Sequence, residues 1–69
     1  MLWLIKEGAS HQVVGCNIHE EKGVHQLWVE RPNGKSTKVA ENKDRSAIKE
    51  IKNMIDHAIK IGDPVLELN

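Results

Sequence analysis

The sequence predicts a small α+β fold in which a four-stranded antiparallel meander is packed on one face by a single long C-terminal helix. Short runs rich in Val, Ile, Leu and Trp alternate with turn residues as far as residue 40. Beyond residue 42, the spacing of apolar residues changes from about two to about 3.6. Gly62-Asp63-Pro64 then ends the periodic segment, as expected at the end of a helix.

The predicted strands are bounded by glycine- or proline-containing turns, and they cover residues 2–6, 11–18, 24–31 and 35–40. Side chains alternate between the two faces of a strand, so the apolar positions identify the face that meets the core. The core-facing side chains expected from this rule are Val14, Cys16, Leu27, Val29 and Val39. In the first strand, either Leu2 and Leu4 or Trp3 and Ile5 point inward.

The last turn sets the pairing of the final two strands. A two-residue loop at Asn33-Gly34 would bring a buried face against a solvated one. We therefore expect a type I turn over Arg31-Pro32-Asn33-Gly34, with Gly34 in the left-handed region. The resulting pairs are Val29 with Thr37, Leu27 with Val39, Trp28 with Lys38 and His25 with Glu41. Across the 20–23 loop, the same parity pairs Ile18 with His25, Cys16 with Leu27, Val14 with Val29 and Gly15 with Trp28.

The helical segment carries a wide apolar stripe from Ala47 to Ile61, which predicts an amphipathic helix lying on the core face of the sheet. Asn42, Asp44 and Ser46 are the candidate caps at its start, and Gly62 is the stop signal. Val65-Leu66-Glu67-Leu68 is a candidate fifth strand, either at an edge of this sheet or on the sheet of a partner. The expected order is thus ββββα or ββββαβ.

The chain is short enough to form a single domain over residues 1–69. Apolar burial is expected to contribute about 100 kcal/mol, and ordering the chain costs about the same. This near balance favours a homodimer or a partner protein that covers more apolar surface. Chains of this size are common among bacterial and phage regulators.

Compartment is indicated by cysteine usage and by the start of the chain. Cys16 is the single cysteine, so no internal disulfide can form and a reducing compartment is expected. The apolar residues 1–5 are followed at once by Lys6 and Glu7, and are too few for a signal or membrane-spanning segment. We therefore expect a soluble, cytoplasmic protein with no membrane partner.

Metal binding and catalysis are not favoured. His11, Cys16, His19 and His25 lie close in the sequence, but Cys16 and His19 point to opposite faces of a strand and no second ligand pair follows. Cys16 is expected to pack in the core, away from any substrate, and Glu20-Glu21 is typical of a solvated loop. We expect no enzyme activity, cofactor, metal or small-molecule substrate.

Trp28 is the leading candidate binding residue. Its predicted register places it on the outward face, opposite Gly15 and Lys38. An indole in this position either covers the strand glycine locally or serves as an interface hot spot. The residues expected to form the protein-binding surface are Trp28, Val13, Val24 and Lys38, with Ala40 nearby and Trp3 or Ile5 as further neighbours.

His25 and Glu41 form a second candidate pair, since the register places them opposite each other at the end of the sheet. A structural hydrogen bond at the entry to the helix is the simpler interpretation. The functional alternative is a latch that responds to pH through the histidine.

Charge is balanced over the chain but uneven along it. The net charge is zero, while residues 31–45 carry five basic against two acidic side chains, or +3. Arg31, Lys35, Lys38, Lys43 and Arg45 are the candidate nucleic-acid-binding residues. The order of strands, turn and helix, with Asn33-Gly34-Lys35 in the turn, resembles the integrase amino-terminal DNA-binding domains over about half the chain. That resemblance implies a sheet that enters the major groove.

The leading functional expectation is therefore a non-enzymatic intracellular interaction module, a regulator, inhibitor or accessory protein. It would bind a partner protein through its open sheet face or an edge strand. Nucleic-acid binding through the 31–45 hairpin is the alternative.

Overall fold

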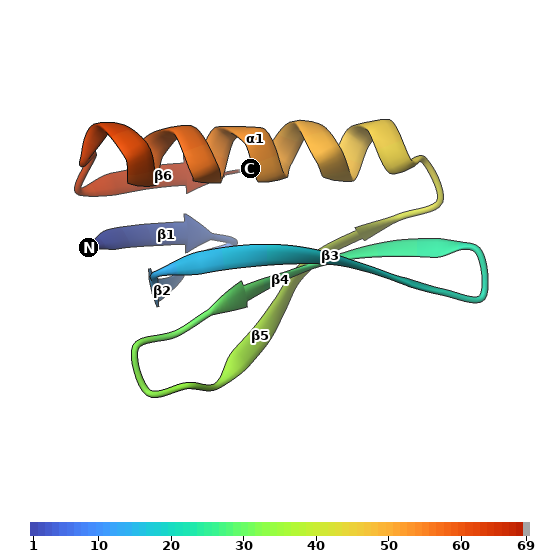
Figure 1. Ribbon diagram of the computed structural model, residues 1–69, viewed down its shortest axis with the longest axis horizontal. Helices are drawn as coiled ribbons and strands as arrows, with labels where there is room; N and C mark the ends of the chain where they lie inside the picture. Colours follow the sequence, from blue (N-terminus) through green and yellow to red (C-terminus); the bar gives the residue numbers. More distant parts are fainter. Residues whose placement is uncertain (69) are drawn as a thin grey trace.

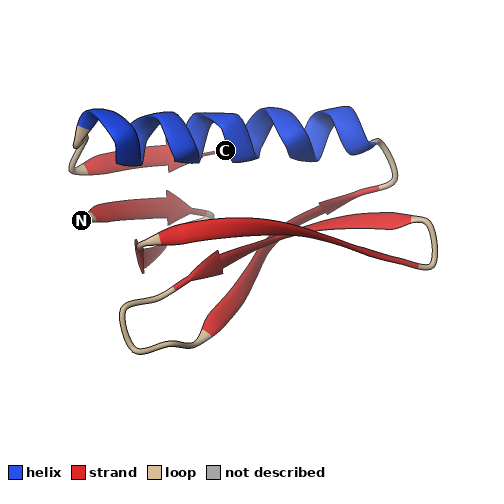
Figure 2. Ribbon diagram, viewed as in Figure 1, coloured by secondary structure: helices blue, strands red, loops and turns tan. Residues whose placement is uncertain are grey.

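The computed structural model describes residues 1–68. In chain order, the elements are β1 (Leu2–Lys6), β2 (Ala9–Val13), β3 (Gly15–Glu21), β4 (Val24–Glu30), β5 (Ser36–Asn42), α1 (Arg45–Ile61) and β6 (Val65–Leu68). They form two three-stranded sheets, ordered β2-β1-β6 and β3-β4-β5. The α+β class and the long helix near the C-terminus are confirmed (Figures 1 and 2).

One hydrophobic core lies between the two sheets and the helix. Its buried side chains are Leu2, Leu4, Val13, Cys16, Leu27, Val29, Val39, Ile48, Ile55 and Ala58. Leu2 and Leu4 are therefore the inward pair of the first strand, and Trp3 points outward with 42% of its surface exposed. Neither tryptophan belongs to this core, which is built from small and aliphatic residues.

The predicted second strand is divided by a bend at Val14. Val13 is buried, whereas Val14 is half exposed, so the expected inward position of Val14 was wrong. Val13 and Cys16 are three residues apart, and a straight strand would place them on opposite faces. The bend before Gly15 reverses the alternation and lets both side chains reach the core. If β2 and β3 are taken as one bent strand, the first five strands follow the predicted meander.

The hairpin between β3 and β4 is tighter than expected. Lys22 and Gly23 alone form the turn, with φ values of 51° and 78°, as in a two-residue hairpin loop. Cys16 consequently pairs with Val29, and Ile18 pairs with Leu27. The register is shifted by two residues from the predicted one, so each side chain still lies on the predicted face of the sheet.

The hairpin between β4 and β5 has the predicted turn. The Gly34 N–H donates to the Arg31 carbonyl at 3.0 Å, the Arg31 N–H donates to the Lys35 carbonyl at 2.8 Å, and Gly34 has a φ of 84°. Trp28 pairs with Lys38 as predicted. Beyond this pair, a bulge shifts the register so that Leu27 faces Ala40 instead of Val39.

The bulge has a clear packing consequence. It turns the adjacent side chains of Val39 and Ala40 toward the core, where Val39 is buried and Ala40 is partly buried. Adjacent residues of a regular strand would point to opposite faces. The residues on either side, Lys38 and Glu41, consequently both lie on the outer face.

The helix begins and ends at capping residues. Asp44 is the N-cap, and its Oδ1 accepts from the Ser46 N–H at 2.9 Å. Gly62 ends the helix in the left-handed region, while the Asp63 N–H donates to the Ala58 carbonyl at 2.9 Å. The chain then returns as β6, which pairs in parallel with β1 and so joins an edge of the protein's own sheet. Asn69 lies outside the described residues.

Candidate functional site

Trp28 lies on the outward side of the β3-β4-β5 sheet, opposite the face that α1 covers. We call this surface the Trp28 face, and its members are Asn17, His19, Gln26, Trp28, Glu30, Ser36, Lys38 and Glu41. Across the strands, Trp28 has Lys38 on one side, as predicted, and Asn17 on the other in place of Gly15. The indole is half-buried, and its Nε1 donates to Gln26 Oε1 at 2.9 Å. This hydrogen bond links the ring to its own strand and satisfies its only donor.

A shallow hollow of about 390 Å³ lies beside the indole. Its lining residues are Asn17, Ile18, His19, Trp28 and Ser36. The hollow therefore combines one aromatic wall with amide, imidazole and hydroxyl groups that can donate and accept hydrogen bonds. Such a surface is suited to binding a ligand with both apolar and uncharged polar groups.

Several charged and polar groups on the Trp28 face are already engaged with one another. Lys38 Nζ lies 2.9 Å from Glu41 Oε1, and Asn17 Nδ2 donates to Glu30 Oε1 at 2.6 Å. The bulge in β5 makes the contact between Lys38 and Glu41 possible, because it brings both side chains to the same side of the sheet. The Lys38 and Glu41 charges consequently compensate each other, whereas Glu30 is hydrogen-bonded to a neutral amide and keeps its negative charge.

The other predicted members of the protein-binding surface lie elsewhere or at its margin. Val13 is 1% exposed and belongs to the core, so its predicted place on the outward surface was wrong. Ala40 also turns toward the core. Val24 pairs with Glu21 at the far end of the hairpin, on the same side as Trp28 but four residues away from it. Trp28 and Lys38 remain together on one face.

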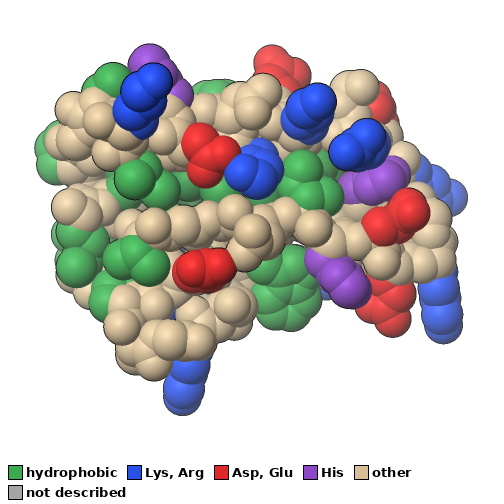
Figure 3. All heavy atoms as spheres, in the orientation of Figure 1, with side chains coloured by type: hydrophobic (Ala, Val, Ile, Leu, Met, Phe, Trp, Pro, Cys, Tyr) green, Lys and Arg blue, Asp and Glu red, His purple; other side chains and the backbone are tan. Residues whose placement is uncertain are grey.

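The predicted basic edge is divided into two parts. Arg31 and Lys35 adjoin the β4–β5 turn, while Lys43 and Arg45 lie at the junction with the helix. These groups are separated by β5, a strand of 7 residues that spans about 23 Å. Lys38 lies between them and is paired with Glu41. The visible face of the molecule likewise shows acidic and basic side chains interspersed (Figure 3).

His25 and Glu41 are not paired, so this prediction was wrong. The bulge shifts the register by one residue, which places Asn42 opposite His25 and Gln26 opposite Glu41. Glu41 binds Lys38 instead. The pH-sensitive latch loses its structural basis.

Cys16 lies under the helix, where Asp56 accepts a hydrogen bond from its thiol and is itself paired with Lys52. Its thiol donates to Asp56 Oδ1 at 3.3 Å, and Lys52 Nζ lies 2.6 Å from Asp56 Oδ2. Burial foremost, and then the hydrogen bond and charge of Asp56, raise the pKa of the Cys16 thiol from 9.0 to about 12. The hydrogen bond to Asp56 also raises the pKa of Lys52. A thiol held protonated in this way is a poor nucleophile and a poor metal ligand.

The histidines and the cysteine do not converge. Within residues 1–68, no group of three or more His, Cys, Asp or Glu side chains is placed to hold a metal ion. Cys16 is in the core, and His19 is on the opposite side of the same sheet.

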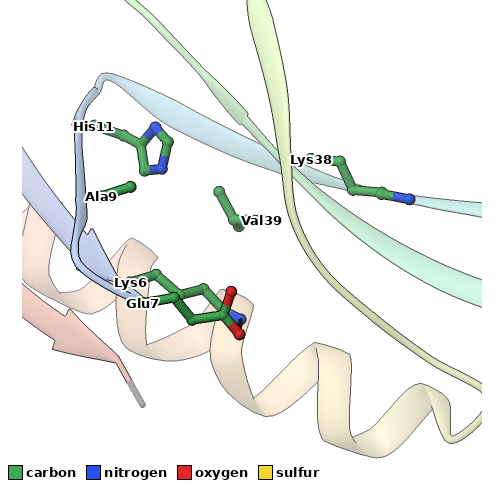
Figure 4. A pocket seen from close by; sticks show the side chains of 6 residues that line it. All are labelled: Lys6, Glu7, Ala9, His11, Lys38 and Val39. Atoms are coloured by element: carbon green, nitrogen blue, oxygen red, sulfur yellow. Dashed lines mark ion pairs between the residues drawn. The ribbon is translucent and has the colours of Figure 1, made fainter.

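A separate cavity of about 170 Å³ lies between the β1–β2 hairpin and β5. His11, Ala9 and Val39 point toward it, whereas Lys38 extends away (Figure 4). The Nδ1 atom of His11 is buried and has no hydrogen-bond partner among the described protein groups. Lys6 and Glu7 line the opposite side of the cavity, 3.9 Å apart. No nucleophile and base are placed together among these residues.

Sequence reasoning had not assigned Asn17, His19, Gln26 and Ser36 to the candidate surface. The place of Gln26 on this face can be derived from the alternation of side chains along the strand that carries Trp28. The positions of Asn17 and His19 beside the strand of Trp28 depend on the β3–β4 register, which the tight Lys22-Gly23 turn sets. Lys22 occupies a left-handed conformation that non-glycine residues adopt infrequently, so the residue types alone gave little indication of that turn.

Comparison with known proteins does not assign the chain: no family model, curated protein or solved structure matches it. In the described part of the chain, no helix has both the length and the apolar character required to cross a membrane.

Proposed function

We propose that the chain is a non-enzymatic protein-interaction module of the cytoplasm, which binds a partner protein through the Trp28 face. The observation that carries this proposal is the placement of Trp28 on a sheet face that no described element covers, beside a hollow of about 390 Å³. Tryptophan is enriched among the few residues that contribute most of the energy of protein interfaces. A side chain of the partner would enter the hollow and pack against the indole.

The charges of the Trp28 face indicate what kind of partner fits. Lys38 is neutralised by Glu41, and Glu30 is bound by Asn17. Since Glu30 keeps its negative charge, the complementary surface is an apolar side chain surrounded by polar groups, with a hydrogen-bond donor or a cation facing Glu30. Docking along the free edge of β6 is less favoured, because the Val65 N–H already donates to Asp63 Oδ1 at 3.2 Å.

Nucleic-acid binding is supported less well. Of its five candidate basic residues, four fall into two groups at opposite ends of β5, and the fifth, the paired Lys38, lies between them. A phosphate backbone is bound best by a continuous row of unpaired cations. We retain this alternative as an outcome of the experiment.

The experiment places a photo-crosslinking amino acid at Ser36, on the rim of the hollow, or at Glu50, on the exposed side of the helix. Lysate of the native host is used with and without nuclease. A specific protein adduct at position 36 that is absent at position 50 is expected, and Trp28→Ala should remove it. With the purified partner, Trp28→Ala should weaken binding by about 2 kcal/mol or more.

Two controls make the result decisive. Trp3→Ala truncates the other tryptophan on a different sheet, so it should leave this partner's binding unchanged. Far-UV circular dichroism should show that Trp28→Ala keeps the fold. Equal crosslinking at both positions, or an adduct that disappears with nuclease, would overturn the proposal, and the second result would favour nucleic-acid binding.

A further inference from the structure

The β2-β1-β6 sheet also has an outward side, which we call the Trp3 face. Its inward side carries Leu2 and Leu4, against which the rest of the core packs. The strand register places the following outward side chains together: Trp3, Ile5, Ser10, Gln12, Val65 and Glu67. Trp3 lies between Gln12 and Val65, and Ile5 lies between Ser10 and Glu67. No described element covers this face (Figure 1).

The Trp3 face has an apolar centre and a polar margin. Trp3 is 42% exposed and its neighbour Val65 is 47% exposed. Ile5 continues the apolar strip, while Ser10, Gln12 and Glu67 border it. This arrangement matches the anatomy of protein interfaces, in which a hydrophobic core is surrounded by polar groups.

The low charge of the Trp3 face favours a second copy of the chain as its occupant. Glu67 is the only formally charged side chain among the outward residues of these three strands. In a twofold contact the same surface serves both partners, so a face with little charge can meet its own copy without repulsion. The Trp28 face, by contrast, carries Glu30, Lys38 and Glu41.

The strand order also separates the two copies of Glu67. About a twofold axis parallel to β1, β6 of one copy lies over β2 of the other. Glu67 then meets Ser10 of the second copy, whose hydroxyl can donate a hydrogen bond to the carboxylate. The two Trp3 side chains meet near the axis, where they can pack against each other.

We propose that a second copy of this chain binds to the Trp3 face and forms a weak isologous dimer. A face three strands wide and about five residues long measures roughly 15 by 16 Å, which is small for a stable interface. Association is therefore concentration-dependent. The proposal is independent of the Trp28 face, which stays exposed in the dimer.

Sedimentation equilibrium from about 10 µM to about 1 mM, with intrinsic fluorescence in parallel, tests the proposal. A monomer–dimer equilibrium is expected, together with a blue shift of Trp3 emission as the concentration rises, which is followed in Trp28→Phe because this variant has Trp3 as its only indole. Val65→Glu introduces a charge beside Trp3 and should weaken dimerisation by about tenfold or more. Met54→Glu is the matched control, because Met54 is an apolar residue of similar exposure (43%) on the helix, and it should leave dimerisation unchanged.

A second substitution tests the orientation. Ser10→Lys places a cation opposite Glu67 of the other copy and should strengthen the dimer, whereas Ser10→Glu should weaken it. Circular dichroism confirms that each variant is folded. A chain that stays monomeric at about 1 mM overturns the proposal. A dimer that persists in Val65→Glu also overturns it. A dimer that Trp28→Ala disrupts overturns it as well, because self-association would then belong to the Trp28 face.

Discussion

At the scale of single residues, Cys16 connects the sheet to the helix. Its thiol donates to Asp56, and Lys52 holds the same carboxylate from one turn earlier in the helix. The folded protein favours the protonated thiol, because burial foremost and then Asp56 raise its pKa to about 12. Cys16 therefore contributes packing and a hydrogen bond to the fold.

The raised pKa of Cys16 predicts a loss of stability in alkaline solution. Its stabilising effect is fully present below the unfolded pKa, near 9.0, and is lost as the pH rises toward the folded value of about 12. We expect the difference in unfolding free energy between the wild type and Cys16→Ala to shrink over this range. Urea denaturation at successive pH values measures this difference. Because both proteins contain the same lysines, the effect of lysine deprotonation on stability cancels in the comparison. A difference that stays constant would contradict the prediction.

Trp28 illustrates how far residue types alone define the site. Its outward orientation and its neighbour Lys38 follow from alternation and from the Arg31-Pro32-Asn33-Gly34 turn, and both are confirmed. Val13 was misplaced because the bend at Val14 changes the parity of the strand, and a single Gly15 does not specify how a strand bends. The function of Trp28 remains a prediction.

At the scale of elements, the helix depends on the cap that Asp44 provides. Its Oδ1 accepts from the Ser46 N–H, one of the donors that a helix start leaves without a partner. Asp44→Ala should lower the unfolding free energy by about 1 kcal/mol. Ser46→Ala is the control, since the bond uses the backbone of Ser46 and survives the change. Thermal or urea unfolding followed at 222 nm makes the comparison, and equal effects of the two substitutions would refute the role of Asp44.

The strands were predicted less completely than the helix, for a physical reason. Helix caps and stops act over a few residues, so the stop at Gly62 could be read from its neighbours and the N-cap could be narrowed to Asn42, Asp44 or Ser46, of which the structure has Asp44. The bulge beside Lys38 instead arises because Val39 and Ala40 both find room in the core. That room depends on the helix and on the other sheet, which are distant in the sequence.

At the scale of the whole molecule, the two sheets and the helix share a single core. Leu4 of one sheet, Leu27 of the other and Ile55 of the helix are all fully buried within it. Each sheet has only three strands and one covered face. Such small sheets have little stability when isolated, so the parts should unfold together.

This shared core predicts one cooperative unfolding transition. Trp28→Phe leaves Trp3 as the only indole, in the β2-β1-β6 sheet, and Trp3→Phe leaves Trp28 in the other sheet. In each variant, the fluorescence midpoint in urea should coincide with the helix signal at 222 nm, at a concentration low enough to exclude dimers. Separate midpoints within one variant would show that the sheets unfold independently.

The sequence by itself determined the α+β class, the helix with its stop at Gly62, the Arg31–Gly34 turn and the outward position of Trp28. These features follow from local periodicity and from residues with restricted backbone conformations. Tertiary structure decided that the meander bends at Val14 into two sheets, that Leu2 and Leu4 point inward, and that β6 joins β1. Each of these depends on which apolar side chains meet across the core, because contacts between distant segments determine which face of a strand is buried and which strands it pairs with.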